Sequence, residues 1–65
     1  MRMTVFWERM NAQFGEQYAA SVARDQQLHQ LGDRSPAEAL DAGEEPRVVW
    51  LAVCEHFDVP VKHRH

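Results

Sequence analysis

Three glycines and three prolines divide this chain into short segments, and their spacing constrains the fold more than any other feature. Both residue types end or begin helices and weaken strand interiors, so each segment between them has room for one short helix. With 65 residues in total, only one small domain can form. The dividing residues are Gly15, Gly32, Pro36, Gly43, Pro46 and Pro60.

The first segment predicts an amphipathic helix. Apolar side chains recur every four residues from Phe6 through Met10 to Phe14, which places them on one helical face. Thr4 is a favourable N-cap residue, so we expect the helix to run from there to about residue 13. Gly15 then provides the stop.

A second helix is expected from Glu16 to about Arg24. The apolar rhythm stalls at Asp25 and resumes at Leu28, so a break or kink near Asp25 is favoured over one bent helix. After such a break, Asp25 could cap a short turn that Gly32 closes. The apolar face of this helix would consist of Tyr18, Ala19, Val22 and Ala23.

The second half opens with the clearest local motif in the chain. Ser35 is followed by Pro36 and, three residues on, by Glu38, which is the pattern of a capping box at a helix start. Gly43 ends that short helix, and Pro46 begins the last one. The last helix ends at residues 58–60, and its apolar stripe consists of Val49, Trp50, Val53, Cys54 and Phe57.

No segment alternates at period two for long enough to predict a strand. We therefore expect an all-α fold, a compact bundle of about four short helices whose second half resembles a helix-turn-helix in outline. The expected organisation is a single helical domain over residues 1–60, followed by a polar C-terminal tail over residues 61–65.

Charge and cysteine content narrow the classes of function. The net charge is −3, and all of it lies in residues 35–65, which carry six acidic and three basic side chains. That balance argues against nucleic acid as the partner, since a basic face normally neutralises phosphates. A lone cysteine excludes an intrachain disulfide, and no apolar stretch is long enough for a signal peptide or membrane span. We expect a cytoplasmic protein.

A group of potential metal ligands near the C-terminus does not have the geometry of a site. Cys54, His56, His63 and His65 fall within twelve positions, but Cys54 lies on the apolar stripe and His56 about 200° further round the helix. We therefore expect no metal site. Phosphate-binding glycine loops and other cofactor motifs are absent from the sequence, so no cofactor is expected.

Catalytic chemistry is not expected either. Cys54 lies toward the C-terminal half of its helix, where the helix dipole disfavours a thiolate. The carboxylates of the second half are explained as caps and solvated helix ends, with no apolar pocket to separate their pKa values. These features predict a protein that is not an enzyme.

Two non-enzymatic functions fit the sequence. The helix-turn-helix outline could bind nucleic acid, but the start of its second helix carries Glu44 and Glu45 beside a single Arg47. The favoured prediction is a protein–protein interaction or accessory module that contacts an unknown protein partner or a second copy of itself. The acidic second half suits a basic partner surface.

Aromatic side chains are the candidates for that contact, because a bundle of this size cannot bury six of them in full. We expect Trp7, Tyr18 and Trp50 to bind the partner, although both tryptophans would also fit the core. The six residues are Phe6, Trp7, Phe14, Tyr18, Trp50 and Phe57.

An ordered set of short motifs runs through the chain: Phe6-Trp7, Phe14-Gly15, Tyr18, Ala23-Arg24-Asp25, Leu31-Gly32, Glu38-Ala39-Leu40 with Gly43, Val49-Trp50, Val53-Cys54 and Phe57-Asp58-Val59-Pro60. Together these motifs resemble a family of small actinobacterial proteins of unknown function. The resemblance covers roughly residues 1–60. Members of this family are often encoded near the RecA and RecX recombination genes, so the resemblance implies a link to DNA repair. The histidine-bearing tail departs from the arginine-rich ending that the family implies.

Overall fold

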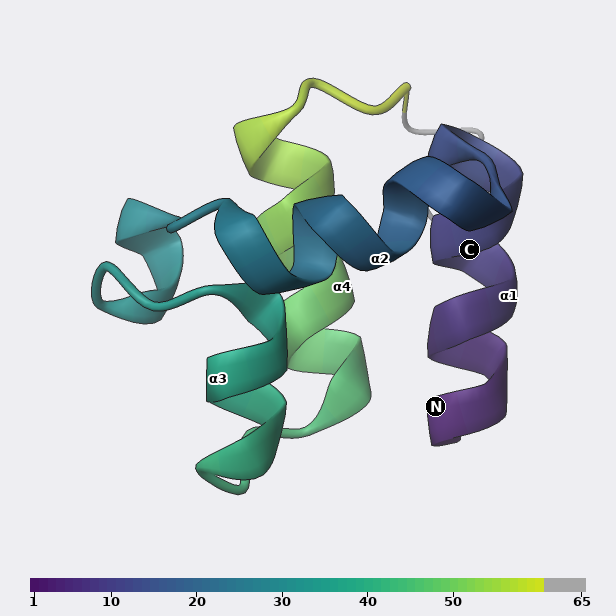
Figure 1. Ribbon diagram of the computed structural model, residues 1–65. Coiled ribbons are helices and arrows are strands. Elements are labelled where there is room, and N and C mark those ends of the chain that lie inside the picture. The colour runs from purple at the N-terminus through teal and green to yellow at the C-terminus, as the bar shows by residue number, and fades with distance from the viewer. Residues whose placement is uncertain (61–65) are drawn as a thin grey trace.

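A computed structural model describes residues 1–60 of the chain (Figure 1). Within this range, extended pairing is limited to one isolated bridge between Leu28 and Arg34, and everything regular is helical. The predicted all-α class is therefore confirmed, while the predicted polar tail lies outside the described residues. The elements are α1 (Met3–Phe14), α2 (Glu16–Asp25), the 3₁₀ turn η1 (His29–Leu31), α3 (Pro36–Asp41) and α4 (Pro46–His56).

The axes of three helices are roughly aligned, and the fourth helix crosses them. In Figure 1, α1 and α4 both begin at the lower end and run upward, α3 runs downward, and α2 passes across the upper half. Helix α4 packs against α1, α3 and η1, and α2 packs against α1 and α3. The chain thus folds around α4, which is the most apolar helix and contributes the most buried residues.

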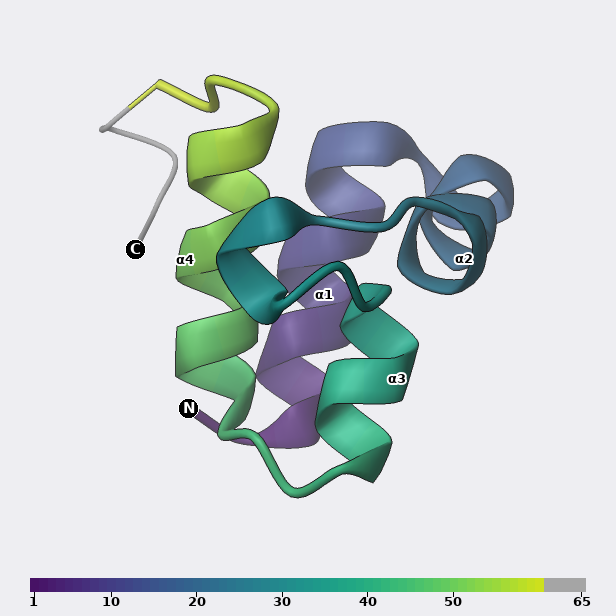
Figure 2. The same ribbon diagram turned by 90° about the vertical axis from the view of Figure 1, so that its left-hand side faces the viewer.

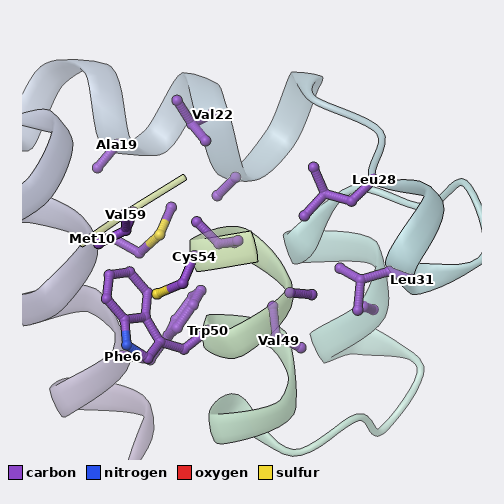
Figure 3. Close-up of a cluster of buried hydrophobic side chains, with 14 residues drawn as sticks. Phe6, Met10, Ala19, Val22, Leu28, Leu31, Val49, Trp50, Cys54 and Val59 are labelled. Atoms are coloured by element: carbon purple, nitrogen blue, oxygen red, sulfur yellow. The ribbon is translucent and has the colours of Figure 1, made fainter. Parts of the chain in front are cut away.

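The core is formed by buried side chains of all four α-helices and of the segment around η1. Trp50 is 1% exposed and is the largest fully buried side chain. Figure 3 shows its ring pointing from α4 toward Phe6 and Met10 of α1, both of which are also fully buried. The predicted stripes on α1 and α4 therefore face each other. Phe14 and Phe57, at the ends of these stripes, are only half-buried.

The boundary between α1 and α2 depends on a glycine. Gly15 has φ 87° and ψ 149°, a conformation that side-chain-bearing residues rarely adopt. Its N–H donates to the Asn11 carbonyl at 2.8 Å, and its own carbonyl accepts from Ala19 N–H at 2.8 Å. One residue therefore ends α1 and begins α2, as the sequence predicts. The predicted N-cap at Thr4 is wrong, because the helix already begins at Met3 and its N-cap is Arg2.

The chain breaks at the end of α2, where the apolar rhythm stalls. Asp25 is the last helical residue, and Gln26 is extended. Asp25 does not cap the next turn as predicted, since its carboxylate instead faces the Arg24 guanidinium at 3.4 Å. η1 begins after Leu28 without a side-chain cap, and Gly32 closes it in the left-handed conformation, as expected.

The predicted capping box at α3 is present in full. Ser35 Oγ accepts from Glu38 N–H at 3.1 Å, and Glu38 Oε1 accepts from Ser35 N–H at 2.9 Å. Ser35 is 1% exposed, so these bonds satisfy its buried N–H and hydroxyl groups. The hydrogen bonds from Ser35, backbone first, favour the ionised carboxylate and lower the pKa of Glu38 below 4.5.

This lowered pKa predicts an acid-dependent loss of stability. The unfolded chain takes up the Glu38 proton first, so the contribution of this carboxylate is present above pH 4.5 and is lost as pH falls through the lower folded value. Glu38→Gln still accepts from Ser35 N–H but does not titrate. As the pH is lowered, the urea midpoint of Glu38→Gln should therefore fall less steeply than that of the wild type.

The matched control is Glu8→Gln, because the Glu8 carboxyl makes no hydrogen bond to another residue within 1–60. It should retain the acid sensitivity of the wild type. Equal acid sensitivity in Glu38→Gln and the wild type would contradict the assignment.

Candidate interaction surface

The three residues predicted to bind a partner lie in different environments. Trp50 is in the core and has no surface to offer a partner, so it does not belong to an interaction surface. Trp7 is half-buried, and its ring meets the edge of Phe6 with centroids 5.3 Å apart. Tyr18 is 59% exposed. The structure therefore does not bring the three together.

Tyr18 also departs from its predicted place on the apolar face of α2. The inward side of that helix is formed by Ala19, Val22 and Ala23, all of which are buried. These are small side chains, so α2 lies close against the bundle, and the larger Tyr18 side chain is directed outward.

Tyr18 is one end of a continuous run of aromatic rings, which we call the aromatic ridge. Its centroid lies 6.4 Å from that of Phe14, and Phe14 meets Phe57 edge-on at 5.3 Å. Phe57 contacts His56 at 4.8 Å, and His56 faces His29 of η1 at 6.2 Å. Both phenylalanines are half-buried, whereas the other three rings are exposed. Such tilted and edge-on pairs are the favoured geometry of aromatic contacts.

The ridge joins four elements that are distant in sequence. Phe14 is the last residue of α1, and the turn at Gly15 places Tyr18 beside it on α2. His56 ends α4 and Phe57 follows it, while His29 begins η1, which packs against α4. The ridge therefore marks the end of the bundle where α4 stops and the chain turns from α1 into α2 (Figure 1).

The end of α4 is held by a Schellman motif with an aspartate where glycine is usual. Val59 N–H donates to the Cys54 carbonyl at 2.9 Å, and Asp58 N–H faces the Glu55 carbonyl at 3.5 Å. Asp58 has φ 53°, in the left-handed region. Val59 is buried, so the motif fixes Phe57 against the core.

We expect Asp58→Gly to stabilise the protein. Glycine adopts positive φ without the steric cost of a Cβ, and the substitution also removes a negative charge from the negative end of α4. The free energy of unfolding should rise by about 0.5–1 kcal/mol, measured by urea denaturation. Asp41→Gly is the control: Asp41 is the last helical residue of α3, and there glycine should destabilise. A loss of stability in Asp58→Gly would contradict this account.

The ridge has acidic neighbours and no metal-binding cluster. Glu16 precedes Tyr18 by two residues, and Asp58 directly follows Phe57; both are exposed. Within residues 1–60, no three His, Cys, Asp or Glu side chains are grouped to hold a metal ion. Cys54 is fully buried and His56 exposed, whereas His63 and His65 lie outside the described residues. No described helix has the length and apolarity to cross a membrane.

Sequence patterns did not identify the ridge as a unit. Phe14 and Phe57 each lie at the end of an apolar stripe, which predicts core positions, and His56 reads as an ordinary surface residue. One local signal existed: Phe14 and Tyr18 are four residues apart across Gly15. Contacts of Phe57 with Phe14, and of His56 with His29, depend on the tertiary fold.

These observations define a class: a small all-helical protein whose clearest surface feature is a run of aromatic rings. The chain belongs to the family described as "Protein of unknown function (DUF3046)", which matches residues 1–62. No curated protein and no solved structure matches the chain. The membership supports the resemblance to a family of unknown function found in the sequence.

Proposed function

We propose that this protein is a non-enzymatic interaction module that binds a protein partner through the aromatic ridge. The observation that carries the proposal is the 59% exposure of Tyr18 at the end of a run of packed rings. Tyrosine provides a large contact area for little conformational entropy, and it is enriched among residues that dominate binding energy. Packing of Phe14 against Phe57 already fixes the rings beneath it.

The chemistry of the ridge favours a basic segment of the partner. Aromatic faces attract guanidinium and ammonium groups, and the effect grows when those groups lose water on binding. Glu16 and Asp58, beside the ridge in sequence, add a complementary negative charge. We therefore propose a partner that presents Arg or Lys side chains.

A role without catalysis is part of the same proposal. The thiol of Cys54 is buried in the core, so it is not accessible as a nucleophile. Resemblance to an actinobacterial family encoded near recombination genes supports an accessory role in DNA repair in the cytoplasm. In such a role the module would act on a protein of that pathway.

Photo-crosslinking in living cells tests the proposal. A photoreactive phenylalanine analogue at position 18 should capture one dominant protein, identified by mass spectrometry, and the same analogue at exposed Ala12 should not. Tyr18→Ala should then weaken binding of that purified protein at least tenfold while the helical circular dichroism is unchanged. Equal capture from both positions, or unchanged binding by Tyr18→Ala, would reject the ridge as the binding surface.

Nucleic-acid binding is the second candidate, because α3 and α4 are joined by a short turn as in a helix-turn-helix. The exposed charged residues at the start of α4 are Glu44, Glu45 and Arg47, which give that end a net negative charge. A gel-shift series at low salt decides between the two functions. Absence of duplex binding at high micromolar protein would exclude the nucleic-acid function, since even non-specific binders show some affinity.

A further inference from the structure

The outward face of α4 carries exposed apolar side chains that the bundle leaves uncovered. Val48 is 46% exposed and Leu51 42%. They are three residues apart and so are neighbours on one helical face. Figure 2 shows α4 at one edge of the molecule, with α1, α2 and α3 all on its other side. This face is separate from the aromatic ridge and from the core stripe.

Two opposite charges flank Leu51 at equal spacing. Arg47 lies four residues before it and Glu55 four residues after, and both are exposed. Neither forms an ion pair with another residue in 1–60, where the ion pair present joins Arg24 to Asp25. Along this face of α4, the side chains are therefore positively charged, apolar and negatively charged, in that order.

That order is self-complementary under a two-fold axis. When two copies of α4 pack antiparallel through Leu51, Arg47 of each copy comes opposite Glu55 of the other, and the two leucines meet at the axis. We propose that the outward face of α4 binds a second copy of this chain, forming a symmetric antiparallel dimer. Neither charge finds a partner if the second copy is parallel, so the pattern also selects the orientation.

The size of the face sets the strength of association. A standard interface takes about 800 Å² from each partner, which is nearly a fifth of the 4303 Å² surface of this small chain. One helix face supplies less than that. Glu44 and Asp58, beyond the two ends of α4, also approach each other in this pairing and repel. We therefore expect a reversible dimer with a dissociation constant in the micromolar range.

Sedimentation equilibrium of the purified full chain with charge-reversal variants tests the proposal. Arg47→Glu and Glu55→Arg each place like charges opposite one another twice, and each should raise the dissociation constant at least tenfold. The double variant, Arg47→Glu with Glu55→Arg, exchanges the charges and should return the constant to within about threefold of the wild type. Leu51→Glu should abolish the dimer, and Tyr18→Ala should leave it intact.

Loss of folding cannot mimic this result. An acidic side chain near the start of α4 and a basic one near its end are both favourable to the helix dipole, so each reversal should keep the monomer folded by circular dichroism. A wild type that stays monomeric at millimolar concentration would overturn the proposal. So would a double variant as weak as the single ones. If the wild type were monomeric and bound duplex DNA, and Arg47→Glu removed that binding, the face would be assigned to nucleic acid instead.

Discussion

Replacing Trp50 with alanine is expected to remove a large part of the stability of the fold. Trp50 is the largest buried side chain and points from α4 toward Phe6 and Met10, so its removal leaves a cavity between α1 and α4. Such substitutions cost about 3–5 kcal/mol in the free energy of unfolding. A domain of this length has a total stability of roughly 3–10 kcal/mol. The loss is therefore a large part of the whole.

Urea denaturation followed by circular dichroism measures this loss. Tyr18→Ala is the control, since it removes another large aromatic side chain from a position that is 59% exposed. Its free energy of unfolding should stay within about 0.5 kcal/mol of the wild-type value. If Trp50→Ala were as stable as Tyr18→Ala, Trp50 would not be the centre of the core. The comparison also separates folding from binding, because only Tyr18 belongs to the aromatic ridge.

Local signals predicted the helices because they act within a few residues. The Ser35 and Glu38 side chains satisfy helix-end donors within their own turn, so their pattern fixes the start of α3 without reference to the rest of the chain. Gly15 likewise determines a boundary through its own φ. Thr4 failed as a cap because other residues can begin a helix, with water or backbone groups meeting the free donors.

Local signals could not predict the aromatic ridge, because two of its ring contacts join residues far apart in sequence. A stripe of apolar residues gives the direction of a helix face, but not which of its members lies at the edge of the core. Phe14 and Phe57 are at that edge because α1 and α4 end together. Tyr18 is outside because three small residues occupy the inward side of α2. Both facts depend on how the helices pack.

The segment after α2 is a second case in which local sequence patterns did not predict the packing. It has little regular structure, yet Leu28 within it is fully buried and belongs to the hydrophobic core. Its carbonyl accepts from the N–H groups of Leu31 and Asp33, both at 3.0 Å, and its N–H donates to the Arg34 carbonyl at 3.0 Å. One side chain thus anchors a loop whose backbone bonds converge on the same residue.

Leu28→Ala is therefore expected to cost about 2–5 kcal/mol in the free energy of unfolding, the range for deleting a buried leucine. Because η1 packs against α4 through this region, the loop should also open locally, and the amides of Leu31 and Asp33 should exchange with solvent faster. Urea midpoints and residue-resolved hydrogen exchange measure the two effects. His29 would then lose its place opposite His56 at one end of the ridge.

Leu51→Ala is the matched control, because it makes the same change at a leucine that is 42% exposed. At low protein concentration, where the chain is monomeric, it should cost less than about 0.5 kcal/mol. A similar cost for both variants would mean that Leu28 does not anchor the loop. A large loss of stability without faster exchange at Leu31 and Asp33 would mean that Leu28 supports the core alone. The expected pair of effects instead makes one loop leucine responsible for both the core and the η1 end of the aromatic ridge.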